Sequence, residues 1–139
     1  MKVTLARKND AVHFVAKNEQ NVELAIDGSP EIGGKDLGFR PMQMLLAGLG
    51  GCSGIDIVNI LKKQRQQLDE FDIEIDGQRE VGVEPSLFKD IHVIFKLKGP
   101  NLDENKVKKA VELSMDKYCS VAKTLESSAK ITYEFQINS

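Results

Sequence analysis

The sequence predicts an α+β fold in which antiparallel sheets are covered by two helices, each carrying one cysteine. Short apolar runs with a period of two residues occur near both ends of the chain and are typical of half-buried strands. A long apolar run with helical spacing fills the middle, and a second helical run precedes the final strand. The predicted order is βββ-α-ββ-α-β, and residues 1–139 are expected to form a single domain.

Composition and charge are those of an ordinary soluble protein. Hydrophobic residues make up 41% and charged residues 29%, and the net charge of −2 gives no electrostatic reason to expect nucleic acid or an acidic membrane as a partner. No apolar signal segment follows Met1, and Asp56, Asn59 and Lys62 interrupt the best candidate for a membrane span. We therefore expect a cytoplasmic protein, in which the cysteines stay reduced.

The first third of the chain predicts three short antiparallel strands. Their alternating apolar residues are Val3 and Leu5, then Val12, Phe14 and Ala16, then Val22, Leu24 and Ile26. A loop over residues 27–40 follows and carries four glycines. Connections of this length are often functional or cross between subunits.

The central segment predicts a long helix that is buried on every face. Pro41 occupies the first turn, where proline is tolerated, and apolar residues then cover nearly the whole circumference as far as about Gln66. A sheet from one chain of this size would not cover such a helix. We therefore expect a second subunit to cover it and the protein to be a homodimer.

The remaining segments predict a hairpin, a second helix and a last strand. Strict alternation over residues 71–75 and 91–97 indicates two paired strands, with Gly82 and Pro85 in the turn between them. A helix begins near residue 101 or 103, runs towards residue 125 and carries Cys119. Alternation resumes over residues 131–137 and predicts the closing strand.

The cysteines are either inert buried thiols or redox-active groups. Three glycines flank Cys52, namely Gly50, Gly51 and Gly54. Each costs the helix roughly 0.5–1 kcal/mol relative to alanine, and together they would let another backbone approach the sulfur or leave a small pocket beside it. The only histidines, His13 and His92, fall on predicted strands, which argues against a Cys–His hydrolase, and no metal-ligand spacing is present.

A reactive thiol also needs a nearby cation, because thiolate is the reactive form. Cys52 lies about eleven positions into its helix, beyond the reach of the helix dipole, so the candidates are Arg40 and Arg7. Asp56 lies one turn after Cys52 on the same face. It would either orient an arginine or make a capping or intersubunit hydrogen bond.

Two runs resemble the cysteine-bearing helices of one known family. RPMQMLLAGLGGCSGID, residues 40–56, is similar to the first-cysteine helix of the OsmC/Ohr family of organic hydroperoxide reductases. KYCSVAKTL, residues 117–125, is similar to that family's second-cysteine helix. The resemblance spans essentially the whole chain and is strongest to the YhfA-like branch.

The resemblance implies an intertwined homodimer with two active sites at its interface. Cys52 would be the peroxidatic cysteine, which attacks an organic hydroperoxide and becomes a sulfenic acid. Cys119 would be the resolving cysteine, which forms a Cys52–Cys119 disulfide. No bound cofactor is implied, and an external dithiol reductant of the lipoyl type would restore both thiols.

The chain departs from the family pattern near the helix start. Family members carry a glutamate just after the helix-starting proline, at one of the positions that Met42 and Gln43 occupy here. Gln43 can accept a hydrogen bond but cannot pair with a cation. The family arginine comes from the N-terminal sheet or the following loop, where this chain offers Arg7 and Arg40.

Two other functions fit the same residues. One alternative is a dimer that binds an apolar small molecule or an acyl chain, with non-catalytic or redox-sensing cysteines. Alternatively, the cysteine pair reduces a disulfide or a reactive electrophile instead of a peroxide. Cys52→Ser separates the peroxidase from the ligand-binding dimer, because turnover depends on the thiol and ligand binding does not. Replacing Cys119 helps to separate the peroxidase from the other thiol chemistry.

Overall fold

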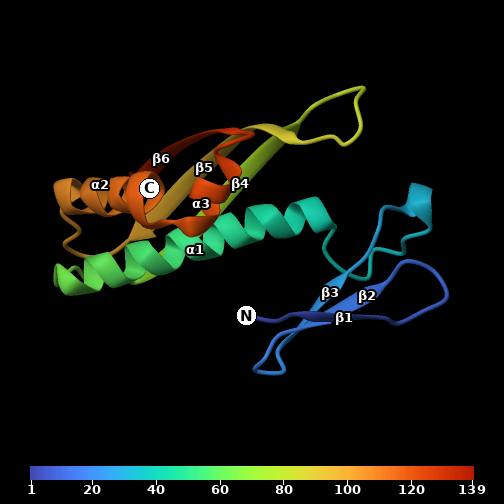
Figure 1. Ribbon diagram of the computed structural model, residues 1–139. Helices are drawn as coiled ribbons and strands as arrows, with labels where there is room; N and C mark the ends of the chain where they lie inside the picture. The colour runs from blue at the N-terminus through green and yellow to red at the C-terminus, as the bar shows by residue number, and fades with distance from the viewer. The chain divides into compact units, whose positions relative to one another are not determined.

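The computed structural model describes all 139 residues, in two compact units that comprise Met1–Leu45 and Leu46–Ser139. The first unit contains a three-stranded antiparallel sheet in the order β1-β2-β3 (Figure 1). Its strands are β1 (Thr4–Arg7), β2 (Phe14–Lys17) and β3 (Glu23–Ile26). The three predicted strands and the α+β class are confirmed, whereas the single domain stays a prediction.

The glycine-rich loop after β3 is organised by the buried carboxylate of Asp27. This carboxylate accepts hydrogen bonds from the backbone N–H groups of Gly28, Lys35 and Leu37 at 2.8, 3.0 and 3.1 Å. These bonds, the one from Lys35 foremost, lower the pKa of Asp27. The loop contains one short 3₁₀ turn, η1 (Pro30–Ile32), and is therefore an ordered connection and not a free coil.

The central helix, α1 (Pro41–Lys63), buries one face only within the chain. That face consists of Leu49, Gly50, Ser53, Gly54, Ile57 and Leu61. On the other side, Ile55 is 65% and Val58 43% exposed. The sheet of the single chain therefore covers only one side of the helix, as expected, and burial of the other side by a second subunit stays a prediction.

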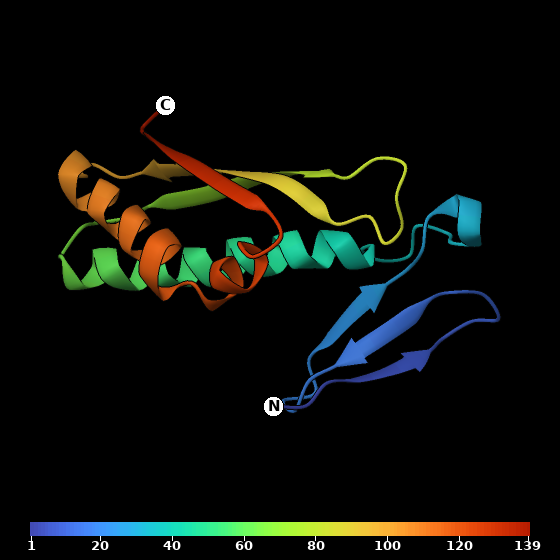
Figure 2. The ribbon, with the colours of Figure 1, turned by 45° about the horizontal axis from the view of Figure 1, so that its top comes forward.

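The second unit contains a mixed sheet in the order β4-β5-β6 (Figure 2). Its strands are β4 (Glu70–Arg79), β5 (Phe88–Lys98) and β6 (Lys130–Ile137). The β4–β5 hairpin is antiparallel, as predicted, but β6 pairs with β5 in parallel, contrary to an all-antiparallel arrangement. The helical segment between β5 and β6 carries the chain back to the end where β5 began, which is the connection a parallel pair requires.

The core of the second unit lies between this sheet and the helices on one of its faces (Figures 1 and 2). Alternate residues of the central strand β5 are buried from Ile91 through Val93 and Phe95 to Leu97, and Phe88 at its start is buried as well. The helix α1 approaches β4 closely, because a Cβ placed on Gly50 would lie 2.7 Å from Cδ1 of Ile75. Gly54 likewise faces Ile73.

The predicted second helix is broken into three parts. Helix α2 (Glu104–Leu113) is followed by a π-helical turn, η2 (Ser114–Tyr118), and a short helix, α3 (Ser120–Leu125). Cys119 lies between η2 and α3 with an extended backbone, φ −72° and ψ 105°. The expectation of one continuous helix carrying Cys119 is wrong, because the Cys119 N–H bonds to the Ser114 carbonyl five residues back and helical geometry then stops.

By length and composition alone, α1 has enough apolar residues to cross a membrane. Its most apolar 18-residue window has a mean hydropathy of 1.6, so the charged residues do not exclude a span by this criterion, contrary to the sequence expectation. A single such helix is weak evidence, since core helices of soluble proteins meet the same criterion. Here the helix packs against β4 through Gly50 and Gly54.

Candidate functional site

The two cysteines of the chain meet in the second unit. Both are free thiols, Cys52 on α1 and Cys119 at the junction of η2 and α3. Their side chains lie close enough for Cys52 to raise the pKa of the Cys119 thiol. Cys119 is completely buried, whereas Cys52 is partly exposed. The site is therefore a pair of adjacent thiols, one accessible to solvent and one enclosed.

The glycines around Cys52 serve the two purposes expected of them, close packing and open space, at different positions. Gly50 and Gly54 face Ile75 and Ile73 of β4, so they let α1 lie close to the sheet. A Cβ on Gly51 would meet no atom of the chain within 4 Å. Only Gly51 therefore leaves open space next to Cys52, and the other two glycines set the depth at which α1 packs.

The π-helical turn brings Cys119 to α1. The N–H of Cys119 donates to the Ser114 carbonyl at 2.8 Å, and the Cys119 sulfur accepts a hydrogen bond from the Ala122 N–H at 3.4 Å. The sulfur thus caps the N-terminus of α3. The first bond holds the Cys119 backbone to η2, and the second holds its sulfur to the start of α3.

Asp56 accepts a hydrogen bond from a residue that the sequence analysis did not single out. The hydroxyl of Ser114, which is completely buried, donates to Oδ2 of Asp56 at 3.0 Å and lies 3.4 Å from the Ser53 carbonyl. Of the roles expected for Asp56, the structure therefore supports a hydrogen bond, but to η2 of the same chain. A serine within an apolar helical run was the available signal for Ser114.

The other side of the π-helical turn is tied to β6. The hydroxyl of Tyr133 donates to both carboxylate oxygens of Asp116, at 3.1 and 3.2 Å. Burial, and then the neighbouring Asp116 carboxylate, raise the pKa of Tyr133 to about 12. The phenol therefore stays a hydrogen-bond donor over the physiological pH range. No sequence pattern indicated this pair, because it joins residues 17 positions apart.

The environment of Cys119 favours its neutral form. Burial is the largest cause and raises the pKa, the hydrogen bond from the Ala122 N–H lowers it, and the adjacent Cys52 side chain raises it again. Together they raise the pKa of the Cys119 thiol from 9.0 to about 11. Cys119 is therefore a thiol at neutral pH, and Cys52 is the solvent-accessible member of the pair.

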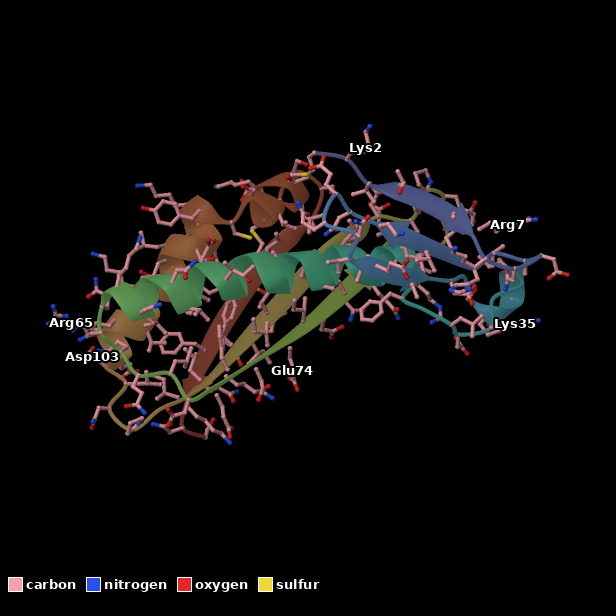
Figure 3. All side chains as sticks on the ribbon, turned by 90° about the horizontal axis from the view of Figure 1, so that it is seen from below. Lys2, Arg7, Lys35, Arg65, Glu74 and Asp103 are labelled. Atoms are coloured by element: carbon pink, nitrogen blue, oxygen red, sulfur yellow. The ribbon has the colours of Figure 1, made fainter.

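The remaining predicted site residues belong to the first unit. Arg40 pairs with Asp36, with 2.8 Å between Nη2 and Oδ1. Gln43 accepts a hydrogen bond from the Arg40 N–H at 3.0 Å and so caps the start of α1. Arg7 ends strand β1, where its side chain extends outward (Figure 3). The activating role of Arg40 or Arg7 stays a prediction, as does a role for Gln43 at the family glutamate position.

Comparison with known proteins identifies relatives over nearly the whole chain. The sequence model for OsmC-like proteins matches residues 33–134. Protein YhfA of Escherichia coli K12 is 34% identical over 128 residues, covering 92% of both chains. The crystal structure of a hypothetical protein from Aquifex aeolicus VF5 has 31% identity, a TM-score of 0.80 and coverage of 99% of this chain and 97% of that chain. The organic hydroperoxide resistance protein OhrB of Bacillus subtilis shares the fold, with a TM-score of 0.65 at 19% identity over 97% and 96% of the two chains.

The raised pKa of Cys119 predicts a loss of stability in alkali. Between pH 9 and about 11 the folded chain keeps a proton that the unfolded chain releases, so the free energy of unfolding falls as the pH rises through this range. Urea unfolding at a series of pH values measures how steeply the free energy of unfolding falls with pH. Cys119→Ser should make this fall less steep, and Tyr133→Phe should reduce the further fall in the free energy of unfolding that extends towards pH 12. An identical slope in wild type and Cys119→Ser would contradict the buried, neutral thiol.

Proposed function

The chain belongs to the OsmC-like protein family, and from this membership and the adjacent thiols we propose that it is a thiol-dependent peroxidase that reduces organic hydroperoxides. The contact between Cys52 and Cys119 is the observation that carries the proposal. Structural neighbours described as organic hydroperoxide resistance proteins support a peroxide-related redox role in general.

The first step assigns Cys52 as the nucleophile, because it is the accessible thiol of the pair. Its thiolate attacks the terminal oxygen of the hydroperoxide and the O–O bond breaks. The alcohol leaves after taking up a proton, and Cys52 becomes a sulfenic acid. We retain Arg40 or Arg7 as the proposed cation that favours the thiolate, in the way the family arginine does.

The second step assigns Cys119 as the resolving thiol. The Cys119 sulfur attacks the sulfenic sulfur of Cys52, the S–O bond breaks, and the hydroxide released combines with the thiol proton to give water. Burial keeps Cys119 away from the hydroperoxide and its side chain already contacts Cys52. An external dithiol, lipoyl-type in this proposal, then reduces the disulfide by exchange in the reducing cytoplasm.

We also propose that the protein works as the homodimer that the family resemblance implies. On the exposed side of α1, small and apolar residues recur at helical spacing at Gly48, Gly51, Ile55 and Val58. Cys52 lies beside this stripe. A partner subunit seated there would bury the exposed apolar side chains and enclose the reactive sulfur.

Titration of the reduced protein with cumene hydroperoxide tests the peroxidase. One equivalent should consume both thiols and leave a chain about 2 Da lighter. Cys52→Ser should abolish thiol loss. Cys119→Ser should still reduce one equivalent of hydroperoxide. Excess hydroperoxide should then oxidise Cys52 to a sulfinic acid, which makes the chain about 32 Da heavier.

The contrast between the two cysteine variants is the control for this test. Cys119→Ser keeps a small polar side chain at the buried position, so its contrast with Cys52→Ser separates the two roles and not merely the number of thiols. Thiols that survive a tenfold excess of hydroperoxide in the wild-type protein would contradict the peroxidase. The exposed apolar stripe would then favour the ligand-binding alternative.

Replacing Ile55 by glutamate tests the dimer. The side chain of Ile55 is 65% exposed in the single chain, so Ile55→Glu should fold normally while placing a charge in the proposed interface. Light scattering at micromolar concentration should give a dimer for wild type and a monomer for the variant. Val81→Glu, at a loop position that is 92% exposed, is the matched control and should remain dimeric. A monomeric wild type, or a dimeric Ile55→Glu protein, would contradict the interface.

A further inference from the structure

We propose that Ser114 and Asp56 are positioning residues that hold Cys119 against Cys52 by tying the π-helical turn η2 to α1. The assignment of Cys119 as the resolving thiol rests on the proposed function. The hydrogen bond between Ser114 and Asp56 is a feature of the structure whatever the function of the cysteines. Neither residue is placed to react with a substrate, since the Ser114 hydroxyl is buried and bonded to the Asp56 carboxylate.

A continuous series of hydrogen bonds connects Asp56 to Cys119. Asp56 lies four residues after Cys52 on α1, and its Oδ2 accepts from the Ser114 hydroxyl at 3.0 Å. The carbonyl of the same serine accepts from the Cys119 N–H at 2.8 Å. A residue one turn from Cys52 is thus linked through Ser114 to the backbone of the second cysteine.

The environment of Ser114 makes this link strong. Ser114 is 0% exposed, so without Asp56 its hydroxyl would have no solvent to bond with and only the more distant Ser53 carbonyl, at 3.4 Å, as an acceptor. A hydrogen bond to a carboxylate is also stronger than one between neutral groups. The Ser114–Asp56 bond therefore stabilises the position of η2 against α1 relative to positions in which this bond is broken.

The turn needs such a link because its backbone is irregular. A π-helical turn lacks the regular bonding of an α-helix, and Cys119 after it has an extended conformation. The bond from Tyr133 to Asp116 ties the opposite side of η2 to β6. The Ser114 hydroxyl ties η2 to α1, where Cys52 lies, and its shorter contact there is the 3.0 Å bond to Asp56.

Disulfide formation makes strict demands on this geometry. The bonded sulfurs lie about 2.0 Å apart, and the two Cα atoms must usually lie within about 4.4–6.8 Å of each other. Loosening η2 would leave Cys119 in such a position for a smaller fraction of the time. The effective concentration of one thiol at the other would fall, and with it the equilibrium constant for forming the disulfide.

Equilibration with glutathione measures that constant without any hydroperoxide. The protein dithiol and oxidised glutathione give the protein disulfide and two molecules of reduced glutathione. We expect Ser114→Ala to lower the constant about tenfold, which raises the reduction potential of the pair by about 30 mV. Asp56→Ala should act similarly. Asp56→Asn, whose side-chain oxygen still accepts from Ser114, should restore most of the wild-type value.

Ser53→Ala is the matched control. Ser53 is also 0% exposed and next to Cys52 in sequence, but its hydroxyl donates only within α1, to the Leu49 and Gly50 carbonyls at 2.8 and 3.4 Å. This variant should keep the wild-type potential. A shift in Ser53→Ala as large as that in Ser114→Ala would overturn the proposal, because it would indicate general loosening of the core.

Unchanged potentials in Ser114→Ala and Asp56→Ala would also overturn the positioning role, even if the protein reduces hydroperoxides. Conversely, the expected shifts would support it even if hydroperoxides do not react. Should Ser114→Ala fail to fold, the comparison of Asp56→Ala with Asp56→Asn tests the same bond from its other end.

Discussion

The site depends on one interruption of helical geometry, the π-helical turn that ends at Cys119. A regular helix running from α2 through residue 125 would use the Cys119 N–H in an ordinary helical bond. Instead the N–H reaches back to Ser114, the backbone becomes extended, and the sulfur caps α3. This local irregularity places the buried thiol in contact with Cys52 on a different helix.

The contact gives two identical side chains different properties. Cys119 is enclosed by the core and its pKa is raised, so it remains a protonated thiol, while Cys52 stays open to solvent. The close approach of α1 to β4 through Gly50 and Gly54 fixes the depth of Cys52 relative to the sheet. Burial and packing therefore place two chemically identical side chains in different environments.

Much of this arrangement could be predicted from the sequence. Alternating apolar residues located the strands, and the glycines around Cys52 indicated close packing, though against β4 and not at the sulfur. The parallel β5–β6 pair and the break before Cys119 were not predictable from periodicity. Both depend on contacts between distant residues, such as Ser114 with Asp56 and Tyr133 with Asp116, which a local pattern does not record.

The most direct test of the account is the connectivity of the disulfide in the oxidised protein. Digestion under non-reducing conditions, followed by mass spectrometry, identifies which cysteine peptides are joined and whether they come from one chain. The account predicts a peptide containing Cys52 joined to one containing Cys119 of the same chain, within a species of single-chain mass after denaturation. Cys52 joined to Cys52 of a second chain, or two cysteines that never cross-link, would contradict the adjacent thiol pair on which the proposed chemistry rests.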